Sequence, residues 1–306
     1  MTDITNSSSA PKKRTAVALG LFDGVHLGHR AVIERAVAIA AEHKAVPAVF
    51  TFDSATVTTK SGLALLSTKA AKFAALDALG VRYVLSPDFS AVREMSGGEF
   101  VTKILRERLN AEYAVCGEDF RCGRNAACTA EMLASACERA GIRVCIVPPV
   151  ECGGERISSS AIRQYLLSGA VEKANLMLGE SFSITAPIVH GNRIGRTLDF
   201  PTINQRFEAG ALVPRHGVYE ASVTLPCGLH SRAYKAVANI GVKPTVTDEG
   251  IPVAETHIIG FSGNLYGSTL TVRLERFIRP EQKFADINAL REQIRRDVRS
   301  VTDRRP

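Results

Sequence analysis

The sequence predicts an α/β protein: a mostly parallel sheet with helices, followed by an antiparallel barrel or sandwich and a terminal helix. Two observations carry this prediction. Between residues 15 and 150, short apolar runs alternate with segments whose apolar residues recur at helical spacing. From about residue 182, the runs become β-rich and are separated by Gly and Pro turns. We therefore expect a flexible leader over 1–14, a first domain over 15–181 and a second over 182–306.

The first part of the chain alternates predicted strands with predicted helices. The strands are expected over 15–22, 45–53, 81–86, 111–120 and 142–150. The helices are expected over 29–44, 67–80, 96–110 and 129–141. The first helix places Val32, Ala36 and Ile39 on one face, and Gly80 follows the second helix where a C-terminal glycine is common. Alternation of this kind implies right-handed crossovers between parallel strands.

The second part is dominated by short strands. They are expected over 182–191, 217–225, 232–241, 254–261 and 268–278. The chain then finishes with an amphipathic helix over 284–301, whose apolar stripe is Ile287, Leu290, Ile294 and Val298.

Composition excludes several classes of protein. The 306 residues are 45% hydrophobic and 23% charged, which is typical of a globular protein with a core, and no apolar run is long enough to span a membrane. The net charge of +7 favours anionic partners, but the absence of Trp and of a long basic block argues against nucleic acid. Seven scattered cysteines without a CxxC pair suit reduced thiols in a cytoplasmic protein. The oligomeric state stays open.

The stretch GLFDGVHLGH, residues 20–29, lies where a buried strand ends and a helix begins. Gly24 and Gly28 would let backbone amides approach a phosphate, and the helix offers its positive N-terminus. His26 and His29 are three residues apart, so both imidazoles could reach one anion. Two such donors could stabilise the extra charge of an in-line displacement at phosphorus. The alternative is that both histidines only cap or pack.

A second segment, RISSSAIRQYLLSG at 156–169, has serines directly before a predicted helix start. Ser158 and Ser159 supply hydroxyl donors, and Arg163 can grip a phosphate with its guanidinium fork. A serine run before a helix is more often only a cap.

A third segment, HGNRIGRTLDFPTIN at 190–204, combines a glycine-containing loop with hard oxygen ligands. The loop offers two glycines for a tight turn and two arginines for phosphates: Gly191, Arg193, Gly195 and Arg196. Thr202 and Asn204 supply a hydroxyl and an amide oxygen, which are ligands suited to Mg²⁺.

These three segments resemble, in order, the motifs of the bacterial bifunctional riboflavin kinase/FAD synthetase (FMN adenylyltransferase) family. CGEDFRCGRNA at 116–126 resembles that family's GxDFxFG segment, and AVANIGVKPTV, AETHIIGFSGNLYG and the final helix resemble its later parts. The resemblance implies a Rossmann-like nucleotidylyltransferase domain followed by a riboflavin kinase barrel. It also implies two reactions: riboflavin plus ATP gives FMN and ADP, and FMN plus ATP gives FAD and pyrophosphate.

The resemblance implies a role for each candidate residue. The catalytic residues would be His26, His29 and Arg163 in adenylylation and Glu255 as the base that takes the proton from the ribityl hydroxyl. ATP would be bound by Phe22, Gly24, Ser158, Ser159, Gly191, Arg193, Gly195 and Arg196. The flavin would lie near Asp119, Phe120 and Arg121, and Mg²⁺ would be held by Thr202 and Asn204.

Some positions depart from the family pattern. The sequence SATVTTK follows Asp53 where the family has a Pro-His-Pro stretch, Cys122 replaces an aromatic residue, and Asp199 replaces a glycine. Asp199 brings a negative charge close to the expected phosphates unless Arg196 or Lys243 compensates. One alternative is therefore a paralogue with one decayed site, which keeps a single activity or only binds flavin. Another is a generic nucleotidylyltransferase fused to a barrel that binds some other phosphorylated ligand or RNA.

Overall fold

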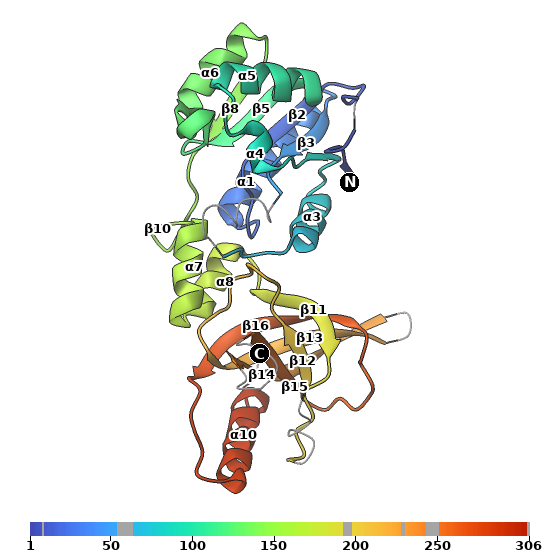
Figure 1. The fold of residues 1–306 in the computed structure, drawn as a ribbon, viewed down its shortest axis with the longest axis vertical. Helices are drawn as coiled ribbons and strands as arrows, with labels where there is room; N and C mark the ends of the chain where they lie inside the picture. Colours follow the sequence, from blue (N-terminus) through green and yellow to red (C-terminus); the bar gives the residue numbers. More distant parts are fainter. Residues whose placement is uncertain (8, 54–63, 192–197, 228–229, 243–250, 305–306) are drawn as a thin grey trace. The chain divides into compact units, whose positions relative to one another are not determined.

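The computed structural model describes residues 1–7, 9–53, 64–191, 198–227, 230–242 and 251–304, in two compact units. The first is Met1–Ser159 and the second is Ser160–Pro306 (Figure 1). None of the helices in these ranges has the length and hydropathy needed to cross a membrane.

The first unit is built on a parallel six-stranded sheet with the order β1-β4-β3-β2-β5-β8. The strands are β1 (Thr2–Asp3), β2 (Thr15–Leu19), β3 (Val46–Phe50), β4 (Tyr83–Leu85), β5 (Ala111–Gly117) and β8 (Arg143–Val147). The helices are α1 (Leu27–Glu42), α3 (Lys69–Ala78), α4 (Phe89–Val92), α5 (Gly97–Glu99), a π-helix (Phe100–Arg108) and α6 (Ala130–Arg139). The alternating parallel architecture predicted from the sequence is confirmed.

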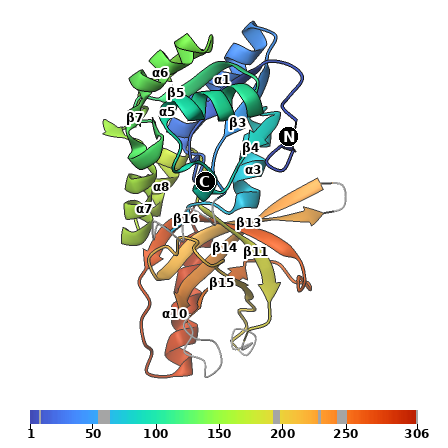
Figure 2. The same ribbon diagram turned by 45° about the horizontal axis from the view of Figure 1, so that its top comes forward.

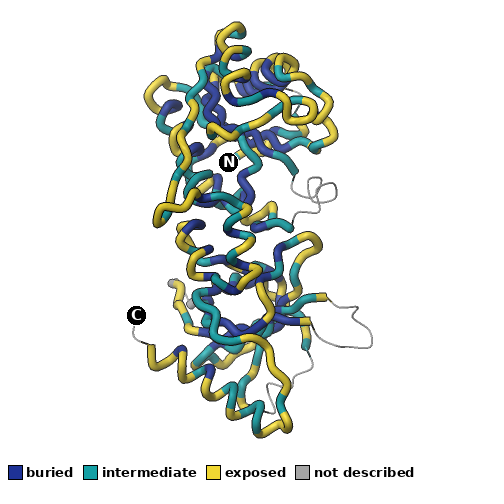
Figure 3. The backbone as a smooth tube through the Cα atoms, turned by 90° about the vertical axis from the view of Figure 1, so that its left-hand side faces the viewer, coloured by how far each residue is buried: buried dark blue, intermediate teal, exposed yellow. Residues whose placement is uncertain are grey.

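Apolar side chains of the central strand point to both faces of this sheet. Val17 and Leu19 join a core with the π-helix and α6, whereas Ala16 and Ala18 join a second core with α1. A parallel sheet covered by helices on both faces buries its strands completely, and β2 is buried throughout. Figure 3 shows the buried residues following the strands within this unit.

Small strands lie on the loops after β5. A hairpin of β6 (Arg121–Cys122) and β7 (Cys128–Thr129) places Cys122 directly opposite Cys128. A short 3₁₀ turn, Arg124–Ala126, joins these two strands, and β9 (Glu151–Cys152) pairs with β10 (Glu155–Arg156) further on. Six cysteines are free thiols: Cys116, Cys122, Cys128, Cys137, Cys145 and Cys152.

The first residues differ from the expected flexible leader. Thr2–Asp3 pair with Tyr83 and Val84, the amino group of Met1 lies 2.6 Å from Asp77, and Ile4 is buried in the core. A single buried Ile in a polar stretch carries no periodicity, so the sequence alone did not indicate this edge strand.

The second unit contains a closed antiparallel barrel with the order β11-β12-β15-β14-β13-β16, which confirms the predicted barrel. Its strands are β11 (Ser183–Val189), β12 (Ile203–Arg206), β13 (Gly217–Cys227), β14 (His230–Val242), β15 (Pro252–Ile258) and β16 (Thr269–Arg279). The long strands β13 and β14 continue as a ribbon beyond the barrel wall (Figure 2). The short strand β12 begins within the PTIN motif, at Ile203, and has too few residues to show a period of two.

Two helices precede the barrel, α7 (Ser159–Ser168) and α8 (Val171–Leu178). Asn175 on α8 donates to the carbonyl of Leu274 at 2.8 Å and accepts from the amide of Phe182 at 2.7 Å. These bonds fasten α8 to β16, so α8 lies in the second compact unit together with the barrel.

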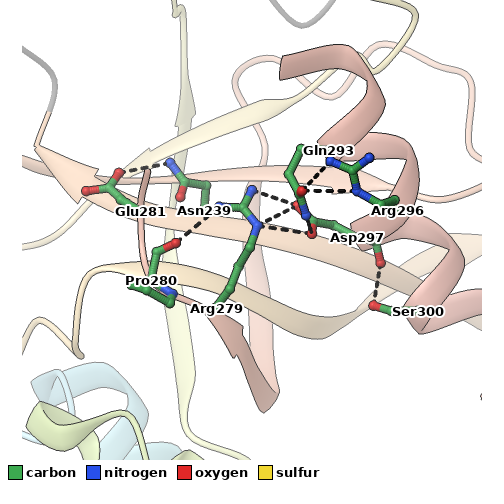
Figure 4. Close-up of polar contacts among 8 residues, drawn as sticks. All are labelled: Asn239, Arg279, Pro280, Glu281, Gln293, Arg296, Asp297 and Ser300. Atoms are coloured by element: carbon green, nitrogen blue, oxygen red, sulfur yellow. Dashed lines mark hydrogen bonds and ion pairs between the residues drawn. The ribbon is translucent and has the colours of Figure 1, made fainter. Parts of the chain in front are cut away.

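The terminal helix α10 (Ile287–Thr302) is held to the barrel by a buried ion pair (Figure 4). Arg279 on β16 donates to both carboxylate oxygens of Asp297, which is 3% exposed, at 2.7 to 3.1 Å. Gln293 donates to the same carboxylate at 2.8 Å. Ile287, expected on the apolar stripe, is instead exposed. Breaking such a pair by removing one partner typically costs about 3–5 kcal/mol, so this contact anchors the helix.

Candidate active sites

The turn between β2 and α1 has an unusual backbone. Phe22 and Val25 have φ angles of 52° and 39°, in the left-handed region, and Gly24 has 79°. Side chains are strained in that region, so the surrounding structure must hold the turn in place. A Cβ at Gly28 would lie 3.2 Å from the ring of His26, so a larger residue there would press on that ring.

The two histidines of this turn are brought together. Their rings stack with centroids 3.5 Å apart, and the edge of Phe22 packs against His29. His26 is 5% exposed and caps α1, because its Nδ1 accepts the amide proton of His29 at 3.2 Å. A neutral imidazole that accepts at Nδ1 carries its proton at Nε2, which leaves that nitrogen as a donor. The Nδ1 side of the His26 ring is therefore used in capping α1.

The segment that enters α3 holds this turn from outside. The Asp23 carboxylate accepts from the amides of Leu66 and Ser67 at 3.0 and 3.2 Å, and Ser67 Oγ accepts from the amide of Gly24 at 3.1 Å. Ser159 Oγ donates to the carbonyl of Asp23 at 3.3 Å. Ser159, predicted from the ISSS run, therefore meets the turn predicted from GLFDGVHLGH. The sequence analysis did not single out Ser67.

The segment expected to bind flavin follows the carboxyl end of β5. Asp119 is exposed and pairs with Arg156 at 3.1 Å, while Phe120 packs against the sheet core. Arg156 also lies 3.7 Å from Glu118. Arg156 was not predicted as a site residue, since an arginine in a Gly-Glu-Arg turn forms no recognisable motif. Arg163 lies on α7, one turn after Ser159.

In the barrel, the expected base lies in a row of polar side chains across three strands. The register sets Glu255 on β15 opposite Asn204 on β12 and opposite Asn239 on β14. Directly paired residues point to the same face of a sheet, so the carboxylate is flanked by two amides. Asn239 also donates to Glu281 at 3.3 Å (Figure 4). Asn239 was not predicted as a site residue, because only the pairing of β14 with β15 brings it opposite Glu255.

Gly191 lies against this row. A Cβ at Gly191 would fall 2.6 Å from the amide group of Asn204, so only glycine lets the loop after β11 approach so closely. Arg193, Gly195 and Arg196 lie outside the described residues.

A pocket of about 490 Å³ opens beside Thr202. Its apolar lining includes Ile188, Ile203, Ile258 and Phe261. Thr256 also lines it and is fully buried, and its hydroxyl has no hydrogen-bond partner among the residues that the structure describes. The lining also includes the polar residues Asp199, Ser262 and Tyr266, so the pocket offers a ligand both apolar surface and hydrogen-bonding groups.

A residue of the terminal helix compensates the negative charge of Asp199. Asp199 contacts the guanidinium of Arg291 on α10. Asp199 has a φ of 67°, which explains physically why a glycine suits this position and why an aspartate is tolerated. Arg196 and Lys243, the two residues expected to compensate the charge of Asp199, lie outside the described residues.

The donors Thr202 and Asn204 fit Mg²⁺ only together with a phosphate-bearing ligand. Within the described ranges, no group of three or more His, Cys, Asp or Glu side chains could hold a metal on its own. Mg²⁺ commonly uses few protein oxygens and completes its shell with substrate phosphates and water. Asn204 is paired with Glu255 in the strand register, so an amide and a carboxylate share one face of the sheet.

Comparison with known proteins decides the family. Residues 8–161 match the model of the FAD synthetase family, and residues 178–304 match the model of the riboflavin kinase family. A bifunctional riboflavin kinase/FMN adenylyltransferase from Pseudomonas fluorescens is 34% identical over 94% of this chain and 92% of its own length. The chain belongs to the bifunctional riboflavin kinase/FMN adenylyltransferase family.

Further members agree with this assignment. The Escherichia coli K12 and Bacillus subtilis members are 33% and 32% identical over 96% and 93% of this chain. They cover 94% and 90% of their own lengths. A crystal structure described as a macrolide-efflux protein from Streptococcus pneumoniae is 28% identical, covers 99% of both chains and has a TM-score of 0.87. The fold of this chain is therefore shared along its length, and both halves of the family are present in it.

Proposed function

We propose that this chain makes FMN and then FAD: it phosphorylates riboflavin with ATP and adenylylates the product with a second ATP. The observation that carries the proposal is the presence of both family matches in one chain, at 8–161 and 178–304. We assign adenylylation to residues 15–181 and the kinase reaction to residues 182–306. The comparisons support two activities rather than a paralogue with one.

In adenylylation, a phosphate oxygen of FMN attacks the α-phosphorus of ATP. The bond from that phosphorus to its bridging oxygen breaks, and pyrophosphate leaves. No covalent intermediate on the enzyme is needed, so the residues position and neutralise. The amino end of α1, Gly24 and the paired rings of His26 and His29 receive the triphosphate. Phe22, Ser158 and Ser159 also bind ATP, and the guanidinium of Arg163 contacts its phosphates. Asp119, Phe120 and Arg121 lie on the flavin side.

In the kinase reaction, the ribityl hydroxyl of riboflavin attacks the γ-phosphorus of ATP. Glu255 takes the proton of that hydroxyl, and the flanking amides of Asn204 and Asn239 orient its carboxylate. Thr202 and Asn204 would hold Mg²⁺, which would neutralise phosphate charge when bound. The phosphates lie along the loop that begins at Gly191 and includes Arg193, Gly195 and Arg196. We expect the enzyme to work in the cytoplasm.

Each activity can be tested with its own substrate. Riboflavin and ATP with Mg²⁺ should release ADP, and FMN and ATP with Mg²⁺ should release pyrophosphate. ADP without pyrophosphate would show that the first unit lacks the proposed activity. Pyrophosphate without ADP would show the same for the second unit.

A further inference from the structure

We propose that Lys72 is a positioning residue for adenylyl transfer, holding the ends of β2 and β3 so that the turn carrying His26 and His29 keeps its shape. This proposal rests on the adenylylation activity proposed for the first unit.

Lys72 is a buried cation beside that turn. It lies on α3, is 1% exposed, and directs its ammonium group to the carboxyl ends of two neighbouring strands. Nζ donates to the carbonyl of Phe52 at 3.0 Å and to Thr51 Oγ1 at 3.3 Å, and it lies 3.5 Å from the carbonyl of Leu21. Ligands of parallel α/β sheets bind at this edge.

The acceptors of Lys72 are connected directly to the histidine turn. Thr51 Oγ1 donates to the carbonyl of Leu21 at 2.7 Å, so Lys72, Thr51 and Leu21 form one network. Leu21 precedes Phe22, the first residue of the turn with a left-handed φ. Fixing the Leu21 carbonyl therefore fixes the point at which the strained turn leaves β2.

The segment that leads into α3 makes a second contact with the turn. The residues entering α3, Leu66 and Ser67, donate their amides to Asp23. One helix thus holds both the start of the turn, through Lys72, and its middle, through Asp23. A shift of α3 would move the histidines relative to the β2 strand end, and a displacement of about 1 Å at a reacting group can cost about 10²-fold in rate.

Burying the charged ammonium of Lys72 costs desolvation free energy, which an apolar residue at this position would not lose. Burial lowers the pKa of Lys72 to about 8, while the carboxylates of Asp23 and Asp53 oppose this and Lys69 adds to it. The charged ammonium has three donors for the three oxygens, and the neutral amine has only two. We therefore expect the network to lose one donor and its positive charge as the pH rises through the pKa of this lysine.

The first test is the pH dependence of the unaltered enzyme. We expect the rate of FAD formation from FMN to fall as pH is raised through about 8, while FMN formation by the same chain shows no such fall at that pH. A rate of FAD formation that stays level through this range would overturn the proposal. If the unaltered enzyme forms no FAD at all, the proposed activity of the first unit itself has failed.

The second test substitutes Lys72→Met, with Lys103→Met as the matched control on an exposed helix position. We expect Lys72→Met to lower kcat of adenylylation by about 10²-fold, to change the KM for FMN little, and to remove the fall near pH 8. Lys72→Arg, which stays charged, should keep activity above pH 8. A Lys72→Met enzyme with the kcat and pH profile of the unaltered chain would refute the role. If the variant does not fold, the pH profile of the unaltered enzyme decides.

Discussion

The rings of His26 and His29 stack at a centroid distance of 3.5 Å, and the backbone amide of His29 donates to His26 Nδ1. The contact that caps α1 therefore places the proton of a neutral His26 ring on Nε2. Within the proposed function, this pair supplies donors to the phosphates of ATP.

Substituting His29→Ala removes one of these donors without touching the cap, which uses the His29 backbone. We expect kcat of FAD formation to fall by about 10²-fold, with FMN formation unchanged. Steady-state assays of both reactions on the same preparation measure this. His43→Ala, at the exposed end of the same helix, is the control and should leave both rates as they are. An unchanged adenylylation rate in His29→Ala would remove His29 from the site.

Glu255→Gln keeps the size of the side chain between Asn204 and Asn239 but removes its basicity. We expect FMN formation to fall by about 10²–10⁴-fold, and FAD formation from supplied FMN to persist. Glu292→Gln, on an exposed position of α10, is the matched control. A Glu255→Gln enzyme that makes FMN at the normal rate would show that another group takes the proton.

Thr256 offers a prediction in which stability and binding move in opposite directions. Thr256→Val removes a buried hydroxyl that has no partner within the described ranges, so we expect the Tm of the free protein to hold or rise. The pocket also includes Thr202, which we assign to the metal-bound nucleotide, so we expect the KM of the kinase for ATP to rise about tenfold. Thr271→Val, whose hydroxyl bonds to Thr185 instead, serves as the control. An unaltered KM for ATP would contradict this use of the pocket.

The contact between Asp199 and Arg291 predicts a rescue. Arg291→Ala leaves the Asp199 carboxylate uncompensated beside Thr202, and we expect the KM of the kinase for ATP to rise by about threefold. Adding Asp199→Gly to that variant removes the charge and relieves the left-handed backbone, and should restore the KM. Failure of the second substitution to restore ATP binding would mean that Arg291 acts in some other way.

Local pattern indicated most strands and helices of the parallel sheet and of the barrel, and it singled out the motif residues that we propose for the two sites. The glycine and histidine spacing indicated the β2–α1 turn, and the ISSS run indicated Ser159, which the structure brings to Asp23. The burial of Lys72 was not predicted, because a lysine in an amphipathic helix normally faces solvent. Asn239 and Arg291 escaped because barrel register and a contact across 92 positions of sequence depend on the whole fold. The edge strand at Thr2–Asp3 escaped because two residues carry no period.

The most direct test of the account is a time course with riboflavin, ATP and Mg²⁺ as the only substrates, with the flavins separated by chromatography. We expect FMN to accumulate first and FAD to follow at the expense of FMN. Accumulation of FMN with no FAD, even when FMN is supplied, would contradict the assignment of the first unit. If neither riboflavin nor FMN is converted by the folded protein, the account as a whole is wrong.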